Sequence, residues 1–218
     1  MIMSIHPSVR SPEEGVEHRT PPGADLLYYP RFLSRDEAER FFALLAGDAC
    51  VCWRQDHIQL YGRRVALPRL TAWHGEPGLR YVYSGIVNET EPWDEALSGL
   101  ARRAGEAAGA RFNAVLLNLY RDERDAVSWH SDNEAELGHE PVIASLSLGA
   151  ERVFQLRHRD HRRNGVPWEE LRLRSGSLLV MRGTTQRLWQ HRLARQTGPC
   201  GPRINLSFRR IERGPPQG

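Results

Sequence analysis

The feature that most constrains this chain is a series of short, strand-like segments that fills its second half. The segments follow Gly109, and turn residues separate most of them. Many short strands at such spacing are typical of a sandwich, a barrel or a jelly roll. The candidate strands are residues 112–121, 142–149, 152–157, 170–174, 177–182, 188–192 and 203–210.

The first half of the chain mixes helices with strands. Ser34-Arg-Asp-Glu37 is a capping-box pattern, which predicts a helix that ends at Gly47. The apolar spacing between Trp93 and Ala108 predicts a second helix. Extended segments are expected at residues 25–29, at 58–65 as a hairpin with Gly62 in its turn, and at 81–83.

Composition fits one core of ordinary size. The chain has 218 residues, 40% hydrophobic and 26% charged. No apolar run approaches a membrane span and no signal peptide is recognised, so we expect a cytoplasmic protein without a membrane partner. Three cysteines make no disulfide framework. All 30 basic residues are arginine, whose planar fork suits phosphate or carboxylate, and the net charge of +3 permits nucleic-acid binding without showing it.

Two candidate strands alternate between an apolar face and a face that carries polar residues. Such alternation ordinarily places the polar face in solvent, but in a small barrel the polar face can line a ligand cavity. Alternation alone leaves both readings open. The polar faces consist of Asn118 and Tyr120 in one strand, and of Arg203, Asn205, Ser207 and Arg209 in the other.

A candidate metal site begins at His130-Ser-Asp132. In an extended chain these side chains leave the same face, with Cα atoms roughly 6.6 Å apart. With His191 they would make two histidines and one carboxylate, the set that leaves the opposite face of an octahedral Fe(II) ion open. The motif is short and occurs twice. The second copy, His158-Arg-Asp160, lies in an arginine-rich run that suits a solvated loop or a phosphate contact better than a cation.

Taken together, several motifs resemble the AlkB family of Fe(II)- and 2-oxoglutarate-dependent dioxygenases, and in particular the members that act on duplex DNA. The resemblance runs in order from about residue 58 to 211. It is carried by Asn118-x-Tyr120, His130-x-Asp132, Ala144-Ser-Leu-Ser-Leu-Gly149, Gly176-Ser-Leu-Leu-Val-Met181, His191 and Arg203-x-Asn-Leu-Ser-Phe-Arg209, and earlier by Gln59-Leu-Tyr-Gly62, Pro68-Arg69 and Tyr81-Val-Tyr-Ser-Gly85.

The resemblance implies a fold, a domain organisation and a cofactor site. The expected fold class is α+β, mainly β, with a double-stranded β-helix (jelly roll), flanking helices and an N-terminal nucleotide-recognition region. The expected segments are a flexible arm (1–24), the helical and nucleotide-recognition hairpin region (25–110), the dioxygenase domain (111–213) and a disordered tail (214–218). Fe(II) is expected on the catalytic residues His130, Asp132 and His191, where O2 also reacts. The 2-oxoglutarate co-substrate is expected on Asn118, Tyr120, Arg203, Asn205, Ser207 and Arg209, with Arg203 at the distal carboxylate and Arg209 nearer the iron.

The resemblance also implies a substrate. Family members oxidise the N-linked alkyl group of bases such as 1-methyladenine or 3-methylcytosine in alkylated DNA, or in RNA, and a base in a duplex must be flipped out first. Tyr61 matches an aromatic wedge at the hairpin tip. The other expected substrate residues are Tyr81, Tyr83, Ser84, Asn133 and Glu134; Asn133 stands where many relatives carry an acidic residue.

Two alternatives stay open at this point. One is a 2-oxoglutarate oxygenase that hydroxylates a protein or small molecule, since the metal site is indifferent to that choice. The other is a non-catalytic β-barrel binding module in which the histidines are incidental. For any of these we expect a monomer.

Overall fold

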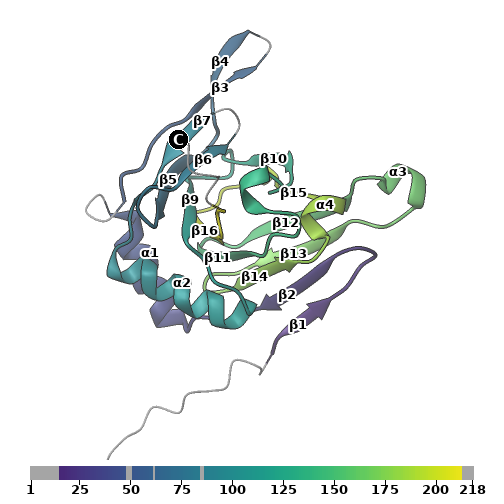
Figure 1. Cartoon of the computed structure of the whole chain (residues 1–218), viewed down its shortest axis with the longest axis horizontal. Coiled ribbons are helices and arrows are strands. Elements are labelled where there is room, and N and C mark those ends of the chain that lie inside the picture. Colours follow the sequence, from purple (N-terminus) through teal and green to yellow (C-terminus); the bar gives the residue numbers. More distant parts are fainter. Residues whose placement is uncertain (1–14, 48–50, 61, 84–85, 213–218) are drawn as a thin grey trace, which may run out of the picture.

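A computed structural model of the chain describes residues 15–47, 51–60, 62–83 and 86–212. Its largest element is an eight-stranded sheet in the order β1-β2-β14-β11-β16-β9-β5-β8 (Figure 1). All neighbours in this sheet are antiparallel except the parallel pair β5–β8. Its strands are β1 (Glu17–Arg19), β2 (Asp25–Tyr29), β5 (Leu70–Gly75), β8 (Glu91–Pro92), β9 (Ala114–Tyr120), β11 (Ile143–Gly149), β14 (Leu178–Arg182) and β16 (Arg203–Arg209).

A second, four-stranded sheet lies against the first and has the order β10-β15-β12-β13. Its strands are β10 (Val127–His130), β12 (Arg152–His158), β13 (Glu169–Leu173) and β15 (Trp189–Leu193). Two hairpins stand apart from both sheets: β3 (His57–Leu60) with β4 (Arg63–Ala66), and β6 (Arg80–Tyr83) with β7 (Ile86–Glu89). The β3–β4 hairpin projects from the body of the molecule (Figure 1).

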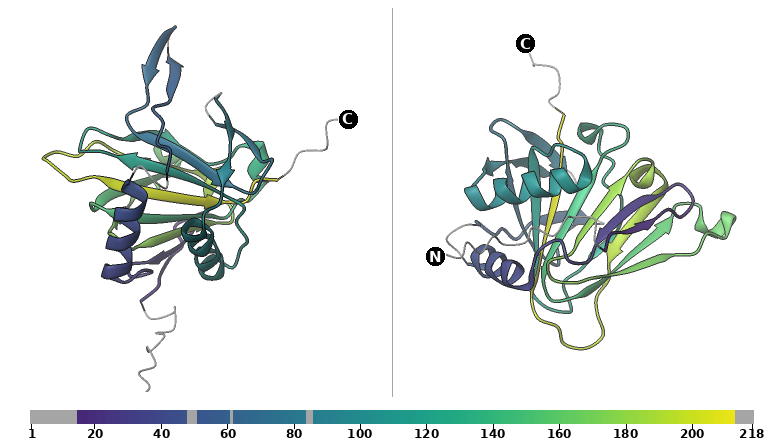
Figure 2. Two further views of the ribbon diagram at one scale, coloured as in Figure 1. Left: turned by 90° about the vertical axis from the view of Figure 1, so that its left-hand side faces the viewer. Right: turned by 90° about the horizontal axis from the view of Figure 1, so that it is seen from below.

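Two helices cover the outer face of the large sheet. They are α1 (Arg35–Ala46) and α2 (Glu95–Ala108), and they lie together on one side of the molecule (Figure 2, right). Shorter turns are η1 (Ala135–Leu137), α3 (His161–Asn164) and α4 (Thr185–Leu188). The expected capping box is present in α1: the Ser34 hydroxyl accepts from the Glu37 N–H, and the Glu37 carboxylate accepts from the Ser34 N–H.

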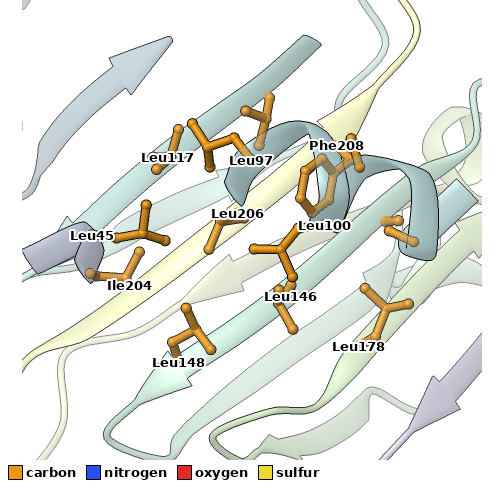
Figure 3. Packing of buried hydrophobic residues seen from close by; sticks show 14 of the residues in the cluster. Leu45, Leu97, Leu100, Leu117, Leu146, Leu148, Leu178, Ile204, Leu206 and Phe208 are labelled. Carbon is orange, nitrogen blue, oxygen red and sulfur yellow. The ribbon is translucent and has the colours of Figure 1, made fainter. Parts of the chain in front are cut away.

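The large sheet is buried on both faces. Its outer face packs Leu117, Leu146 and Leu206 against Leu97 and Leu100 of α2 (Figure 3). Its inner face contributes to a second cluster with side chains of the smaller sheet. The molecule is therefore layered as helices, large sheet and small sheet, and the interior of the jelly roll lies between the two sheets.

This layering decides the reading of the two alternating strands. Val115, Leu117, Ile204 and Leu206 face the helices, so the polar residues of β9 and β16 face the space between the sheets and not solvent. The cavity reading is confirmed. The mainly-β jelly-roll expectation is also confirmed, with strand boundaries that differ from the predicted ones by one or two residues.

The expected segment boundaries need correction at two places. The flexible arm of residues 1–24 includes Glu17–Arg19, which pairs with β2 because an extended segment there completes the sheet edge. The boundary near residue 110 does not separate two structural units, because β5 from the first half pairs with β9 from the second. Residues 1–14 and 213–218 lie outside the described residues.

Candidate metal centre and co-substrate cavity

The two histidines of the candidate metal site lie opposite each other on paired strands. β10 and β15 run antiparallel with His130 in register with His191, and the ring centroids are 4.2 Å apart. Asp132 follows two residues after the end of β10, and its Oδ1 lies 4.0 Å from His130 Nε2. One ligand atom from each of the three residues lies within 4.8 Å of the others. The fold thus brings His191 next to His130 and Asp132, although the two histidines are 61 positions apart in the sequence (191 − 130 = 61).

A slip in the strand pairing turns His130 toward the interior. Val127 pairs with Leu193, which would place residue 129 opposite His191 in a regular ladder, but His130 occupies that position. β10 therefore contains one extra residue, as in a β-bulge. Because side chains alternate along a strand, the slip directs His130 inward and Trp129 outward.

Hydrogen bonding fixes the tautomer of His130. Its Nδ1 lies 2.8 Å from the carbonyl oxygen of Ser128, and because a carbonyl only accepts, Nδ1 must carry the proton. The lone pair is then on Nε2, the atom that faces Asp132. The ring of His191 stacks on Phe154, with centroids 5.2 Å apart. Both imidazoles are held in defined orientations, as metal-binding histidines require.

The electrostatic environment keeps the three groups in their metal-binding forms. Burial lowers the pKa of His130, and burial together with the charge of His130 lowers the pKa of His191 to about 3. Burial alone would raise the pKa of Asp132, but the charges of Arg209, His191 and His130 outweigh it and lower that pKa. Two neutral imidazoles beside a carboxylate are a donor set that fits Fe(II).

Contacts behind the trio hold the Asp132 segment in place. The side chain of Gln186 on α4 is buried, and its Oε1 accepts a hydrogen bond from the Asp132 backbone N–H at 3.0 Å. Its Nε2 lies 3.4 Å from the sulfur of Met181. The Ser131 hydroxyl donates to the carbonyl of Trp189 at 2.7 Å. The chain that carries Asp132 is therefore tied to α4 and to the start of β15.

A cavity opens beside the trio and contains every predicted co-substrate residue. Arg209 lies at the metal end, where its Nη2 is 3.6 Å from Asp132 Oδ2. Arg203 lies at the other end, in register with Tyr120, and its guanidinium carbon is 5.3 Å from the centre of that ring. Besides the trio itself, the polar residues that line the cavity are Arg69, Asn118, Tyr120, Ser145, Arg203, Asn205, Ser207 and Arg209.

Arg203 is a buried cation without a carboxylate partner among the residues the structure describes. Its side chain is 2% exposed, and burial lowers its pKa to about 10. One nitrogen donates to Ser147 Oγ at 2.9 Å, whereas Nε has no hydrogen-bond partner within the described part of the chain. A buried guanidinium with unused donors is costly unless an anion completes it. A carboxylate is the group that such a fork holds best.

Other polar groups in the cavity are fixed by hydrogen bonds. The Asn205 amide donates to Ser145 Oγ at 2.7 Å, and its oxygen accepts from Ser207 Oγ at 3.0 Å. Asn118 Oδ1 accepts from Arg69 Nε at 2.9 Å. These contacts orient the amides before any ligand enters.

Some residues of the site were not among the predicted ones. Arg69 was associated with substrate recognition only through Pro68-Arg69, but it is 4% exposed and lines the cavity. Ser145 was part of a recognised motif, and the alternation of that strand could have assigned it to the inner face. Nothing in the sequence pattern distinguished Phe154 or Gln186, because only the packing of distant strands gives them their role.

The predicted substrate residues are less well placed. Tyr61 and Ser84 lie outside the described residues, and of Tyr81 and Tyr83 only the backbone of β6 is described. Asn133 is exposed and Glu134 is half-buried, and neither is among the residues that line the cavity. Their assignment to substrate stays a prediction.

The second His-x-Asp motif is not wholly a solvated loop, because His158 is buried at the end of β12 and only the residues after it form an exposed turn. Nδ1 of His158 accepts from the backbone N–H of Asp160 at 3.0 Å and contacts Asn164 Nδ2 at 2.8 Å. Within the described ranges, the trio of His130, Asp132 and His191 is the only cluster of three histidine, cysteine or acidic residues with metal-site geometry. Over the same ranges no helix is long and apolar enough to cross a bilayer.

Comparison with known proteins agrees with this geometry. Residues 25–209 match the family described as the 2OG-Fe(II) oxygenase superfamily. The chain is 42% identical over 189 residues to the human alpha-ketoglutarate-dependent dioxygenase alkB homolog 3, covering 84% of this chain and 65% of that protein. It is 35% identical over 215 residues to the Arabidopsis thaliana DNA oxidative demethylase ALKBH2, covering 87% of this chain and 67% of that protein.

A solved structure has the same fold. The structure of OsALKBH1 superposes with a TM-score of 0.60 at 16% identity, covering 89% of this chain and 99% of that one. The present chain spans just under two thirds of the length of the human relative that it matches. A match over most of the chain, together with the histidine–aspartate–histidine trio in a jelly roll, shows that the protein belongs to the AlkB family within the 2OG-Fe(II) oxygenase superfamily.

Proposed function

We propose that this protein removes alkyl groups from N-alkylated nucleic-acid bases by oxidation that depends on Fe(II), 2-oxoglutarate and O2. The observation that carries the proposal is the juxtaposition of the metal-binding trio with the buried, incompletely bonded Arg203 in a single cavity. The assignment of substrate is supported by relatives named DNA oxidative demethylase. Alkylated DNA, and RNA as a second candidate, are the partners this implies.

The cofactors supply the oxidising power, and the protein supplies binding and orientation. When bound, Fe(II) and 2-oxoglutarate support O2-dependent hydroxylation of the alkyl carbon, after which the hydroxyalkyl group leaves the base as an aldehyde. His130, Asp132 and His191 would hold the metal. Arg203 would hold the distal carboxylate of 2-oxoglutarate, while Asn118, Tyr120, Asn205 and Ser207 border its path.

Arg209 has a separate task at the metal end. Its guanidinium is 1% exposed and lies 3.6 Å from the Asp132 carboxylate. It therefore keeps Asp132 ionised and leaves a positive charge beside the position where the keto-acid end of 2-oxoglutarate would bind. Two arginines at opposite ends of one cavity suit a ligand with two carboxylates.

The test is a turnover assay with defined lesions. The protein is incubated with Fe(II), 2-oxoglutarate, ascorbate and oligonucleotides that carry 1-methyladenine or 3-methylcytosine, and succinate and formaldehyde are measured. Both products should form in equal amounts and should be lost in Asp132→Ala. Succinate without formaldehyde on every methylated base would favour a different substrate, either a protein or a small molecule. Failure to bind metal or 2-oxoglutarate in folded protein would favour the binding module.

A further inference from the structure

The outer face of the small sheet carries a group of tryptophans and arginines that the proposed reaction does not use. Trp129 lies between two guanidinium groups, with Arg157 at 4.2 Å and Arg192 at 4.5 Å from its ring centre. Trp168 meets Trp129 edge-on at 5.0 Å and is also contacted by Arg192 at 5.4 Å. Trp168 is 42% exposed, so part of its ring is accessible for stacking. We refer to Trp129, Trp168, Arg157, Arg192 and Arg162 as the aromatic–arginine patch.

The arginines of the patch make no direct ion pair with a carboxylate of any described residue. Arg157 bonds to the neutral Gln190 Oε1 at 3.0 Å, and Arg192 bonds to the neutral Gln155 Oε1 at 2.7 Å. No ion pair involves Arg157, Arg192 or Arg162 within the described part of the chain. Burial, and then the charges of Arg192 and Arg162, lower the pKa of Arg157, as expected where like charges are held together.

One carboxylate on this side of the molecule, that of Glu170, belongs to the hydrogen-bond network of the patch through Gln155, which also bonds to Arg192. Glu169 lies 3.9 Å from Arg19 and is paired away from the patch, so of these two glutamates Glu170 alone stands against the three arginines Arg157, Arg162 and Arg192. Asp160 is exposed, but its loop also carries the exposed residues Arg159 and Arg162. The face therefore retains an excess of positive charge next to an exposed aromatic ring, and its chemistry is suited to an anion with flat, stackable groups.

The patch lies on the back of the two strands that carry the metal-site histidines. Trp129 precedes His130 on β10, and Arg192 follows His191 on β15. Because neighbouring residues on a strand point to opposite faces, the patch lies on the other side of the same strands from the cavity. One sheet separates the patch from the cavity, and β10 is the edge strand of that sheet, so a nucleic-acid strand with its lesion in the cavity reaches the patch around β10.

We propose that the aromatic–arginine patch binds an unpaired nucleotide beside the lesion, with its base stacked on Trp168 and its phosphates held by Arg157 and Arg162. The inference rests on the proposed function, because it extends the same substrate beyond the cavity. Stacking requires a base that is free of its complementary strand, so the patch favours single-stranded or locally opened nucleic acid. A guanidinium held against an aromatic ring keeps its N–H donors directed outward, toward phosphate oxygens.

The first experiment measures binding without chemistry. The full chain is titrated into a labelled, unmodified single-stranded DNA of about 15 nucleotides, the length range that such grooves cover, and fluorescence anisotropy gives Kd. Trp168→Ala should weaken binding about 5- to 100-fold, the value of one base–aromatic stack. Trp168→Phe should restore most of it. Arg157→Gln should reduce the slope of log K against log salt by about 0.7 for each phosphate that the variant no longer neutralises.

Two controls separate the patch from general effects. Arg102→Gln removes one exposed arginine from α2, on the side of the molecule away from α3, and should leave Kd unchanged (Figure 1). Blunt duplex DNA of the same sequence should bind more weakly than the single strand and should be affected less by Trp168→Ala. Equal losses for single strand and duplex, or no loss, would overturn the stacking proposal. If the patch variants lose binding to polyglutamate but still bind DNA as the wild type does, the patch would be assigned to an acidic protein instead.

A second experiment separates this proposal from the proposed reaction. Dealkylation is compared on a long methylated strand and on a methylated nucleotide too short to reach the patch. Trp168→Ala should raise KM for the long substrate and reduce the preference for it over the short one, with little change in kcat. An unchanged preference refutes the patch while the reaction stands. If the wild type dealkylates neither substrate but Trp168→Ala still reduces DNA binding, the proposed reaction is refuted while the patch stands.

Discussion

Replacing Arg203 with methionine should separate the stability of the empty protein from its affinity for 2-oxoglutarate. In the absence of ligand, Arg203 is a buried cation whose Nε makes no hydrogen bond to any described residue. Methionine fills a similar volume without a charge, and replacing a buried ionic group by an apolar side chain of similar volume is often neutral or stabilising. The Tm of the ligand-free variant should therefore equal or exceed that of the wild type, although Arg203 is only 2% exposed.

With 2-oxoglutarate bound, the wild type should instead have the higher Tm. At about 100 times Kd, 2-oxoglutarate stabilises the wild type by about 2.7 kcal/mol, or roughly 5–11 °C in Tm for a chain of this size. Loss of two charge-assisted hydrogen bonds, at about 1.5 kcal/mol each, weakens binding about 100-fold or more. The same concentration then stabilises the variant by about 0.4 kcal/mol, or about 1 °C.

The assay is differential scanning fluorimetry under nitrogen, with and without 2-oxoglutarate. Arg102→Met is the matched control, because it changes an exposed arginine on α2 and should alter neither Tm nor the ligand-induced shift. A ligand-free Arg203→Met protein that melts well below the wild type would show that Arg203 supports the fold. A ligand-induced shift of wild-type size in the variant would show that the carboxylate binds elsewhere. Either result refutes the reasoning.

Three further predictions follow from other parts of the structure. Gln186→Leu leaves the Asp132 N–H without its acceptor, and should weaken Mn(II) binding, measured by electron paramagnetic resonance, about 10- to 100-fold while Gln186→Glu weakens it less. Burial would raise the pKa of Asp125, but hydrogen bonds from Arg121 outweigh burial and lower that pKa below the ordinary aspartate value of 3.8. When the pH is lowered below 3.8, the Tm of the wild type should therefore fall more steeply than the Tm of Asp125→Asn. Leu206→Ala should reduce the free energy of unfolding by about 2–5 kcal/mol, measured by urea denaturation.

Each of these predictions has a contradicting outcome. Unchanged metal affinity in Gln186→Leu would show that the Asp132 segment is held by Ser131 alone. The sign for Asp125 is fixed: a lowered pKa in the folded state gives stability that is present above the unfolded pKa and lost as pH falls. Parallel Tm curves for the two proteins would therefore remove Asp125 as the cause. If Leu206→Ala reduces the free energy of unfolding by much less than the expected amount, α2 has moved to fill the volume left by the leucine side chain, and an unchanged m-value would support that explanation.

The sequence pattern predicted the parts of the fold that depend on local chemistry. The capping box at Ser34, the helical spacing up to Ala108 and the alternation in Arg203–Arg209 each depend on neighbouring residues, and each corresponds to an observed element. Alternation could not decide whether the polar face of a strand meets solvent or a cavity. That depends on whether a second sheet covers it, which is a long-range fact.

The site residues show the same contrast between features set by nearby residues and features set by distant contacts. The histidine–aspartate–histidine trio was predicted through a recognised combination of motifs, since each motif alone was too short to be specific. The strand β10 escaped prediction because its four residues show no regular alternation, and its pairing slips between Val127 and His130. Arg69 and Gln186 acquire their roles from contacts with residues about 50 positions away (118 − 69 = 49; 186 − 132 = 54), which no local pattern records.

The extra residue in β10 lets this short strand direct His130 toward the cavity and Trp129 toward the opposite surface. Val127 and His130 both line the cavity although they are three positions apart, so two residues between them share the space opposite Arg192. A chain without residue 129 would pair Val127, Ser128 and His130 evenly with Leu193, Arg192 and His191, and the imidazole would still face the metal position. A single-codon deletion there would therefore keep an imidazole facing the metal position, remove the indole from the opposite surface, and shorten the segment across which His130 Nδ1 bonds to the Ser128 carbonyl.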